Sequence, residues 1–349
     1  MLFFSFILLP EFDVAMGRFR RAYRKIEYRA WKERKMTKLT VGLALGSGAA
    51  KGWAHIGVLN GLAKLDIYPD KVAGCSVGAL VGAAYANNHL GELETWVSGF
   101  SSWDVLGLMD LGWRKGGLIS GEKVFDVLAN RIGDLNIEQL NRPFAAVATD
   151  LYSGQEIWFK EGDLRHAVRA SCSMPGFLPP VQQGHRWVVD GAVVNPVPVS
   201  LARSMGVDVV IAVDLNGHRR GQMHLIPEQV KSRKATKSEP IDEKRELESG
   251  FMDLWGKGKD YMNGLTDKFS LGSSKSHPGM LAVMSQSMDI LEQRHKRSRL
   301  MGEPPDICIV PDVGDIGTME FHRAKEAIKA GEQAVSDIKH LIEATLKKC

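Results

Sequence analysis

The chain of 349 residues is 44% hydrophobic and 25% charged, and its formal net charge is +4. That length and composition allow one large buried core with appended segments. Residues 1–38 hold ten Lys or Arg and four Asp or Glu, a net charge of +6, which leaves 35 basic and 37 acidic residues, or −2, for the rest. The remainder is therefore not a basic platform, and no nucleic-acid partner is expected.

The N-terminal segment divides into an apolar run and a basic run. Residues 2–9 are apolar, but a helix needs about twenty residues to span a bilayer, and no basic residue precedes them as in a signal peptide. Residues 18–35 are basic, and their apolar positions fall on one helical face. They form either a helix that lies on an anionic membrane or an extension upstream of Met36 without a role. We predict a cytoplasmic protein, peripheral on the inner face of the membrane in the first case.

The next segment has the pattern of a buried strand that runs into a glycine-rich loop. Residues 39–45 are mainly apolar, and residues 53–65 have helical spacing. Amides of small residues at a helix N-terminus can converge on an anion, either an oxyanion or a dinucleotide pyrophosphate. The spacing G-x-G-x-x-x-G departs from the dinucleotide fingerprint, and the next strand ends in a serine. The pattern favours an oxyanion loop formed by Gly46, Ser47, Gly48, Ala49, Ala50, Lys51 and Gly52.

A G-x-S-x-G pentapeptide follows, between a short apolar run and a helical run of small residues. It consists of Gly74, Cys75, Ser76, Val77 and Gly78. A serine on a tight strand-to-helix turn presents its hydroxyl at the edge of a sheet, and the glycines prevent collisions of Cβ atoms. The pattern predicts that Ser76 is a nucleophile.

The only Asp-Gly dipeptide of the chain is Asp190-Gly191, which follows the run 186–189 and precedes Ala192. An aspartate at the end of a buried strand, with a glycine that allows close backbone approach, can act as a fixed base. An ordinary Asx turn is the alternative interpretation. A base needs a pKa above the usual value of about 3.9, and partial burial of Asp190 would raise it.

A histidine-containing triad is the competing arrangement. His218 or His322 would satisfy the order Ser, acid, His of an α/β-hydrolase. None of the ten histidines has a local signature, and His55, on an apolar helix face, has the pattern of a packed core residue. The sequence therefore favours a serine–aspartate dyad.

Taken in order, these motifs resemble the patatin-like phospholipase family, most closely its bacterial RssA-type branch. The resemblance runs from about Leu39 to His340. In that family the elbow serine and the Asp-Gly aspartate form a catalytic dyad, and the glycine-rich loop supplies the oxyanion hole. Ser76, Asp190 and residues 46–52 match these positions. Further blocks of resemblance are 148–151, 170–176, 189–196 and 311–317.

The chain departs from the family pattern inside the loop. Ser47 and Ala49 stand where many members carry glycine, and Lys51 stands where arginine is commoner. Alanine still offers its amide, so we expect the oxyanion hole to survive. Because the helix dipole disfavours a cation in a first helical turn, Lys51 is either solvated or close to an anionic substrate or intermediate.

Helical segments fall between most of the predicted strands, which indicates a mainly parallel sheet covered on both faces, the three-layer α/β/α fold that the resemblance implies. The catalytic core is placed at residues 39–215, after the extension 1–38. Polar residues 216–278 are predicted to be a surface insertion, partly disordered, and residues 279–349 complete the domain. Met280, Met284 and Met288 are expected to fill the core. The predicted strands are 39–45, 72–75, 144–148, 156–159, 187–189, 207–214 and 307–310.

The cysteines Cys75, Cys172, Cys308 and Cys349 have neither metal-ligand spacing nor a disulfide framework, which fits a reducing compartment. No metal or organic cofactor is expected. Residues and resemblance together predict a serine hydrolase of lipid acyl esters, of phospholipase A, lysophospholipase or esterase type. An acyltransferase with the same acyl-enzyme and a non-catalytic regulatory adaptor that retains the fold are the alternatives.

Overall fold

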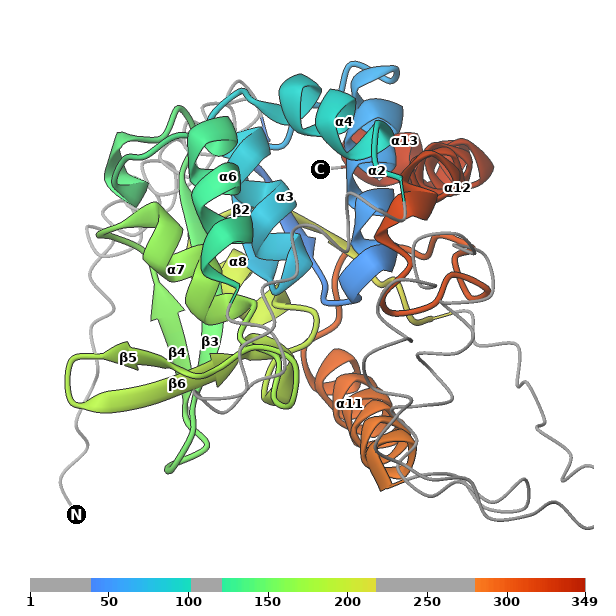
Figure 1. Cartoon of the computed structure of the whole chain (residues 1–349). Coiled ribbons are helices and arrows are strands. Elements are labelled where there is room, and N and C mark those ends of the chain that lie inside the picture. Colours follow the sequence, from blue (N-terminus) through green and yellow to red (C-terminus); the bar gives the residue numbers. More distant parts are fainter. Residues whose placement is uncertain (1–38, 102–120, 218–279, 349) are drawn as a thin grey trace, which may run out of the picture.

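The computed structural model describes residues 39–101, 121–217 and 280–348. The predicted N-terminal extension and almost all of the predicted insertion lie outside these residues. The described residues are organised around one eight-stranded sheet with helices on both of its faces (Figure 1).

The sheet follows the order β5-β6-β3-β2-β1-β7-β8, and β4 pairs with β3 beside this path. The pairs among β3, β2, β1, β7 and β8 are parallel, whereas β4, β5 and β6 pair antiparallel. The sheet is therefore mixed and mainly parallel, which confirms the predicted fold class. The strands are β1 (Val41–Leu45), β2 (Lys71–Cys75), β3 (Phe144–Asp150), β4 (Glu156–Phe159), β5 (Val181–Gln183), β6 (Arg186–Asp190), β7 (Val209–Val213) and β8 (Ile307–Ile309).

All seven predicted strands are present, with ends that differ by at most two residues from the predicted ones. The sequence does not predict β5. This strand has only three residues, and its two glutamines are exposed, so it lacks the apolar pattern of a buried strand. It forms by pairing with β6 through a tight turn at Gly184.

The two faces of the sheet carry side chains of different size. In β1, Leu43 and Leu45 join the larger core, and Ala44 joins the smaller one. In β7, Ile211 belongs to the larger core and Ala212 to the smaller one. Because successive side chains of a strand point to opposite faces, this alternation separates the two cores. The small side chains let α8 pack directly on β1, β2 and β7.

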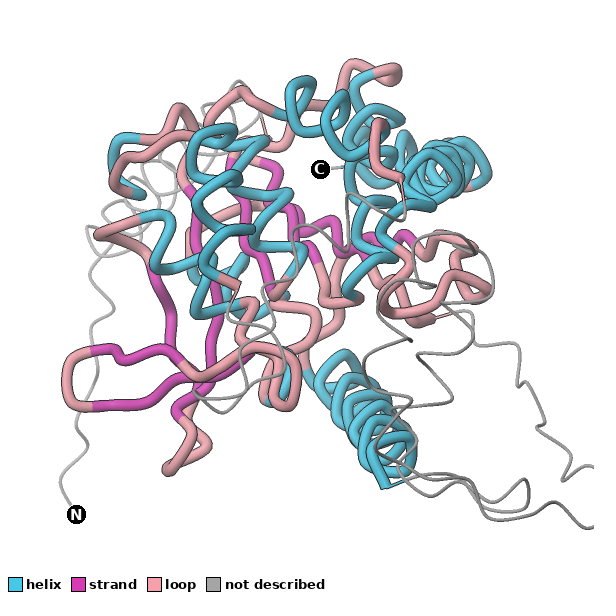
Figure 2. The backbone as a smooth tube through the Cα atoms, in the orientation of Figure 1, coloured by secondary structure: helices cyan, strands magenta, loops and turns pink. Residues whose placement is uncertain are grey.

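The larger core includes α2, α3 and α7, with α12 packed on α2, and the smaller core lies under α8 (Figure 2). The α-helices are α2 (Ala54–Ala63), α3 (Val77–Ala86), α4 (Leu90–Ser98), α6 (Glu122–Ile132), α7 (Leu164–Ser171), α8 (Val199–Ser204), α11 (Met280–Gly302), α12 (Ala324–Asp337) and α13 (Lys339–Lys348). The 3-10 helices are η1 (Ala49–Trp53), η2 (Ile137–Gln139), η3 (Gly191–Val193) and η4 (Phe321–Arg323).

The predicted insertion is followed by α11, which lies at the lower edge of the domain in Figure 1. The expectation that Met288 fills the core is wrong, because its side chain is 48% exposed. At the C-terminal end, Ile338 separates the two consecutive helices α12 and α13. No helix within the described ranges is long and apolar enough to cross a membrane.

Candidate active site

Ser76 lies between β2 and α3 on a turn with φ 55° and ψ −126°. This backbone conformation is rare for residues other than glycine and is typical of functional turns. The flanking positions leave no room for a side chain. A Cβ atom at Gly78 would lie 2.3 Å from the carbonyl oxygen of Leu45, and one at Gly74 would lie 2.4 Å from the Cα of Ala79. The backbone of the pentapeptide thus has the geometry of a strand-to-helix elbow.

Asp190 ends β6, and its side chain meets Ser76. The Ser76 Oγ donates to Asp190 Oδ2 at 2.6 Å, and the amide of Ala192 donates to Asp190 Oδ1 at 2.8 Å. Gly191 allows the chain to turn over β3, because a Cβ atom there would lie 2.4 Å from the carbonyl oxygen of Val147. The fold therefore brings the pentapeptide and the Asp-Gly dipeptide into direct contact.

The Asp190 carboxyl is only 1% exposed, so its burial is nearly complete and exceeds the partial burial expected from the sequence. Burial raises the pKa of Asp190 to about 7, while the hydrogen bonds from Ser76 and Ala192 oppose the shift. The charge of Glu292 raises the pKa further. A carboxyl with this pKa can accept a proton effectively near neutral pH.

The glycine-rich loop has few amides left for a ligand. The Gly52 amide lies inside η1, and four other amides donate to carbonyl oxygens. In the described backbone contacts, Gly48 and Ala49 are the two loop residues whose amides have no such acceptor. Ala49 has φ 49°, in the left-handed region. The four donations are Gly46 to Val213 (3.1 Å), Ser47 to Pro196 (2.8 Å), Ala50 to Thr318 (3.1 Å) and Lys51 to Gly48 (3.2 Å).

His55 is fully buried beneath this loop, and its Nε2 lies 2.7 Å from the carbonyl oxygen of Gly46. Burial lowers the pKa of His55 to about 4, so the ring is neutral at pH 7 and Nε2 donates this bond. The ring therefore supports the loop from below. The described contacts include no histidine bonded to Ser76 or Asp190. His322 lies in η4, and His218 falls outside the described residues.

Two cavities meet at Ser76, Ala49, Met174 and Thr318. One is mainly apolar and measures about 180 Å³, and its walls include Trp53, Leu80, Phe125 and Leu178. The other is mainly polar and measures about 450 Å³, and its walls include Lys51, Asp190, Asn216, Asp289 and Glu292. The serine hydroxyl thus lies at a boundary between an apolar and a polar space. Lys51 donates to Asn216 Oδ1 at 3.1 Å in the polar cavity.

Two residues contact the predicted site without having been predicted themselves. Ser171, at the end of α7, accepts from the Ser76 amide at 2.9 Å and donates to the carbonyl oxygen of Val147 at 2.7 Å, so it ties the elbow to β3. Glu292, in α11, accepts from the Ser47 Oγ at 2.6 Å. Ser171 lies in a block of family resemblance that could have indicated it, whereas Glu292 has no motif around it.

Metal ligands are not grouped in this site. Across the described ranges, no three His, Cys, Asp or Glu side chains lie together as a metal ion would require. Burial raises the pKa of both Cys75 and Cys172 beside the dyad, which keeps these thiols protonated near neutral pH.

The chain is similar to several known proteins. A family model described as patatin-like phospholipase matches residues 43–203. An uncharacterized NTE family protein of Mycobacterium tuberculosis is 31% identical over 319 residues, which cover 83% of this chain and 89% of that protein. Patatin-like phospholipase domain-containing protein 7 of Mus musculus is 33% identical over 190 residues, 52% of this chain and 14% of that protein. The crystal structure of VipD from Legionella pneumophila gives a TM-score of 0.39 at 10% identity, over 88% of this chain and 67% of that one.

The fold and the family match define a class, an α/β protein of the patatin type. The mycobacterial relative matches most of both chains, and the family model covers the elbow, the loop and the Asp-Gly dipeptide. The chain belongs to the patatin-like phospholipase family. Membership of this family implies a lipid acyl hydrolase.

Proposed function

We propose that the protein is a serine hydrolase of lipid acyl esters in which Ser76 is the nucleophile and Asp190 is the base. The observation that carries this proposal is the 2.6 Å hydrogen bond from the Ser76 hydroxyl to a buried carboxyl. A serine hydroxyl is a weak nucleophile until a base takes its proton. Asp190 is placed to do so directly, without a histidine between the two groups.

The reaction then has two half-reactions. Ser76 Oγ forms a bond to the ester carbonyl carbon as its proton passes to Asp190 Oδ2, and the carbonyl oxygen becomes an oxyanion. The Gly48 and Ala49 amides stabilise that charge, and one such donor contributes about 3 kcal/mol. When the intermediate collapses, the bond to the leaving alcohol breaks and Asp190 returns the proton to it. Water attacks the acyl-enzyme in the same way.

The two cavities fit the two halves of such a substrate. Burial of apolar surface favours an acyl chain in the apolar cavity, at about 0.8 kcal/mol for each buried methylene group. The polar cavity would then receive the leaving alcohol or head group, and later the attacking water. This division supports a phospholipase A, lysophospholipase or esterase over an enzyme for fully polar esters.

Other assignments rest on the sequence. An acyltransferase would share the acyl-enzyme and differ only in the second acceptor, and a regulatory adaptor would keep the fold without turnover. The order of the motifs along the chain supports a position near the bacterial RssA-type branch of the family. A basic helix at residues 18–35 would let a cytoplasmic enzyme dock on anionic lipid. Those residues lie outside the described part of the chain.

The test is labelling of the purified full chain with a fluorophosphonate probe, followed by identification of the modified residue. We expect the probe on Ser76 and expect Ser76→Ala to lose both labelling and hydrolysis of a soluble short-chain ester. Ser153→Ala, at an exposed turn, is the matched control and should retain both. Turnover that persists in a folded Ser76→Ala variant would refute the assignment of the nucleophile.

A further inference from the structure

Glu292 is a carboxylate from a distant part of the chain that contacts the glycine-rich loop. Its Oε1 accepts from the hydroxyl of Ser47 at 2.6 Å, across 245 residues of sequence. Glu292 is half-buried and faces the polar cavity together with Asp190. The dyad chemistry described above does not use this carboxylate.

Ser47 directly precedes Gly48 and Ala49, the two residues whose amides are assigned to the oxyanion. Its own amide donates to the carbonyl oxygen of Pro196 at 2.8 Å, and its side chain is held by Glu292. The left-handed conformation of Ala49 costs about 1–2 kcal/mol and persists only when its surroundings hold it. The contact between Ser47 and Glu292 lies immediately before this strained turn.

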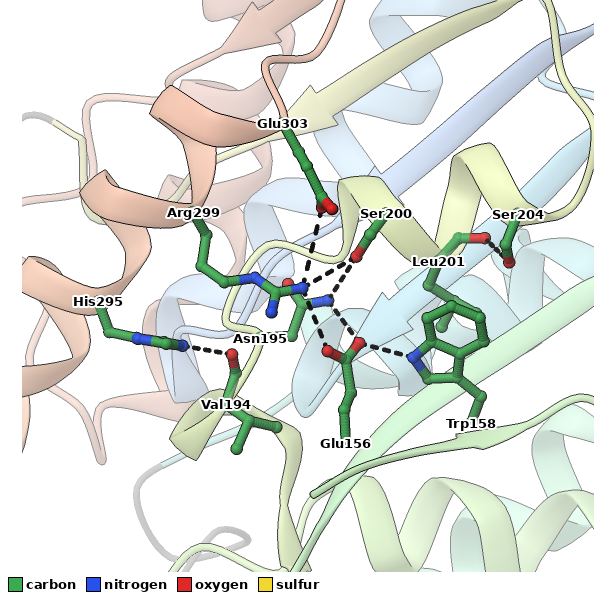
Figure 3. A network of polar contacts seen from close by, with 10 residues as sticks. All are labelled: Glu156, Trp158, Val194, Asn195, Ser200, Leu201, Ser204, His295, Arg299 and Glu303. Carbon is green, nitrogen blue, oxygen red and sulfur yellow. Dashed lines mark hydrogen bonds and ion pairs between the residues drawn. The ribbon is translucent and has the colours of Figure 1, made fainter. Parts of the chain in front are cut away.

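The helix that carries Glu292 is anchored by polar contacts of its own. One turn further along α11, Lys296 pairs with Asp214 at 2.7 Å, and both side chains are buried. His295 and Arg299 contact β4, α8 and the residue that follows η3, as Figure 3 shows. His295 Nε2 lies 2.5 Å from the carbonyl oxygen of Val194, and Arg299 contacts Glu156 at 3.1 Å and Ser200 at 3.0 Å.

Moving α11 away would separate Lys296 from Asp214 and leave a buried charge without its partner, which is costly. The ion pair and the contacts of His295 and Arg299 therefore fix the position of α11. Glu292 is therefore carried by an anchored helix, so its carboxylate has a defined position next to Ser47. Its hydrogen bond joins the C-terminal part of the domain to the loop that follows β1.

We propose that Glu292 is a positioning residue: through the hydrogen bond from the Ser47 hydroxyl, it holds the turn at Gly48 and Ala49 so that both amides face the oxyanion. This inference rests on the proposed hydrolase function. Glu292 does not touch the reacting atoms, and its effect is transmitted by the loop.

The charge of Glu292 has a second consequence that a purely structural contact would not have. The charges of Asp289, Lys296 and Asp214 act on the pKa of Glu292, and the charge of Glu292 acts in turn on Asp190. Burial raises the pKa of Glu292, and the hydrogen bond from Ser47 lowers it. In its ionised form Glu292 raises the pKa of Asp190. Replacement by glutamine keeps an oxygen that can accept from Ser47 but removes this charge.

The experiment compares Glu292→Ala, Glu292→Gln, Ser47→Ala and the double variant Ser47→Ala/Glu292→Ala on a soluble short-chain ester. We expect Glu292→Ala to lower kcat by about 10- to 100-fold with a much smaller change in KM, because a misplaced oxyanion donor affects the transition state. Glu292→Gln should retain most of kcat and move the acidic limb of the pH profile to lower pH. Ser47→Ala should resemble Glu292→Ala, and the double variant should be no worse than either.

Arg294→Gln, at an exposed position two residues away in α11, is the matched control and should behave as the wild type. Additive losses in the double variant, or wild-type kcat in Glu292→Ala, would overturn the positioning role. If Glu292→Ala does not fold, Ser47→Ala carries the test, because it removes the same hydrogen bond and leaves α11 unchanged; wild-type kcat in that variant overturns the positioning role. Failure of the hydrolase proposal itself is recognised separately, by turnover that persists in Ser76→Ala.

Discussion

Replacement of Asp190 by asparagine is expected to remove most of the activity and to stabilise the protein at alkaline pH. Asparagine has nearly the same shape as aspartate, so its oxygen can still accept from the Ala192 amide and its NH₂ group can donate to Ser76 Oγ. The variant should therefore keep the fold while it loses the proton acceptor. Turnover should fall by at least about a hundredfold, as is normal when general-base assistance is lost.

The expected gain in stability follows from the pKa of the buried carboxyl. Burial raises this pKa from 3.8 to about 7, so the folded state binds the Asp190 proton more tightly than the unfolded state does. The contribution of Asp190 to the free energy of unfolding is therefore largest below its unfolded pKa. It decreases as the pH rises above that value and is fully lost once the pH has passed the folded pKa. At 1.36 kcal/mol per pKa unit, ionisation of Asp190 costs the folded state about 4 kcal/mol at about pH 8. At about pH 5 the folded state keeps Asp190 protonated while the unfolded state is mostly ionised, and the loss of stability is only about 2 kcal/mol.

Asparagine carries no charge at either pH, so Asp190→Asn removes this cost. The free energy of unfolding, measured by urea denaturation with tryptophan fluorescence, should increase relative to the wild type by about 2–3 kcal/mol more at pH 8 than at pH 5. Asp134→Asn, at an exposed position, is the control and should show no such pH dependence. An equal difference for Asp190→Asn at both pH values would refute the raised pKa, and retained turnover would refute the role as base.

Two further predictions test the elbow and the N-terminal segment. Gly78→Ala should lower the free energy of unfolding by about 1–3 kcal/mol and impair turnover, because its Cβ would meet the Leu45 carbonyl at 2.3 Å. Gly91→Ala, in α4 with no atom near its added Cβ, should be neutral or stabilising in the same denaturation assay, and similar effects of the two would contradict the steric argument. The full chain should sediment with anionic vesicles less at about 1 M than at 0.1 M salt. A chain that begins at Met36 should bind the vesicles less but keep soluble-ester activity; equal binding would show that residues 18–35 are incidental.

The sequence predicts the long strands and the motifs well because the signals are local. A buried strand such as β1 or β7 requires an apolar run, and the elbow requires glycines at particular positions beside Ser76. Short or exposed elements have no such signal, so the sequence does not predict β5. The sequence also does not predict that Met288 is exposed, because a methionine is compatible with both a core and a surface position.

The sequence alone determined the local backbone of the candidate site, since glycine and serine at fixed spacing decide which turns the chain can make. It also determined the mainly parallel sheet, through the alternation of apolar runs and helices. Only the tertiary structure decided which groups meet. The sheet order places Asp190 beside Ser76, burial sets the pKa of that carboxyl, and backbone pairing leaves the Gly48 and Ala49 amides available. The contact of Glu292 with Ser47 depends on how α11 docks, and a contact between residues so far apart in the chain leaves no local pattern in either segment.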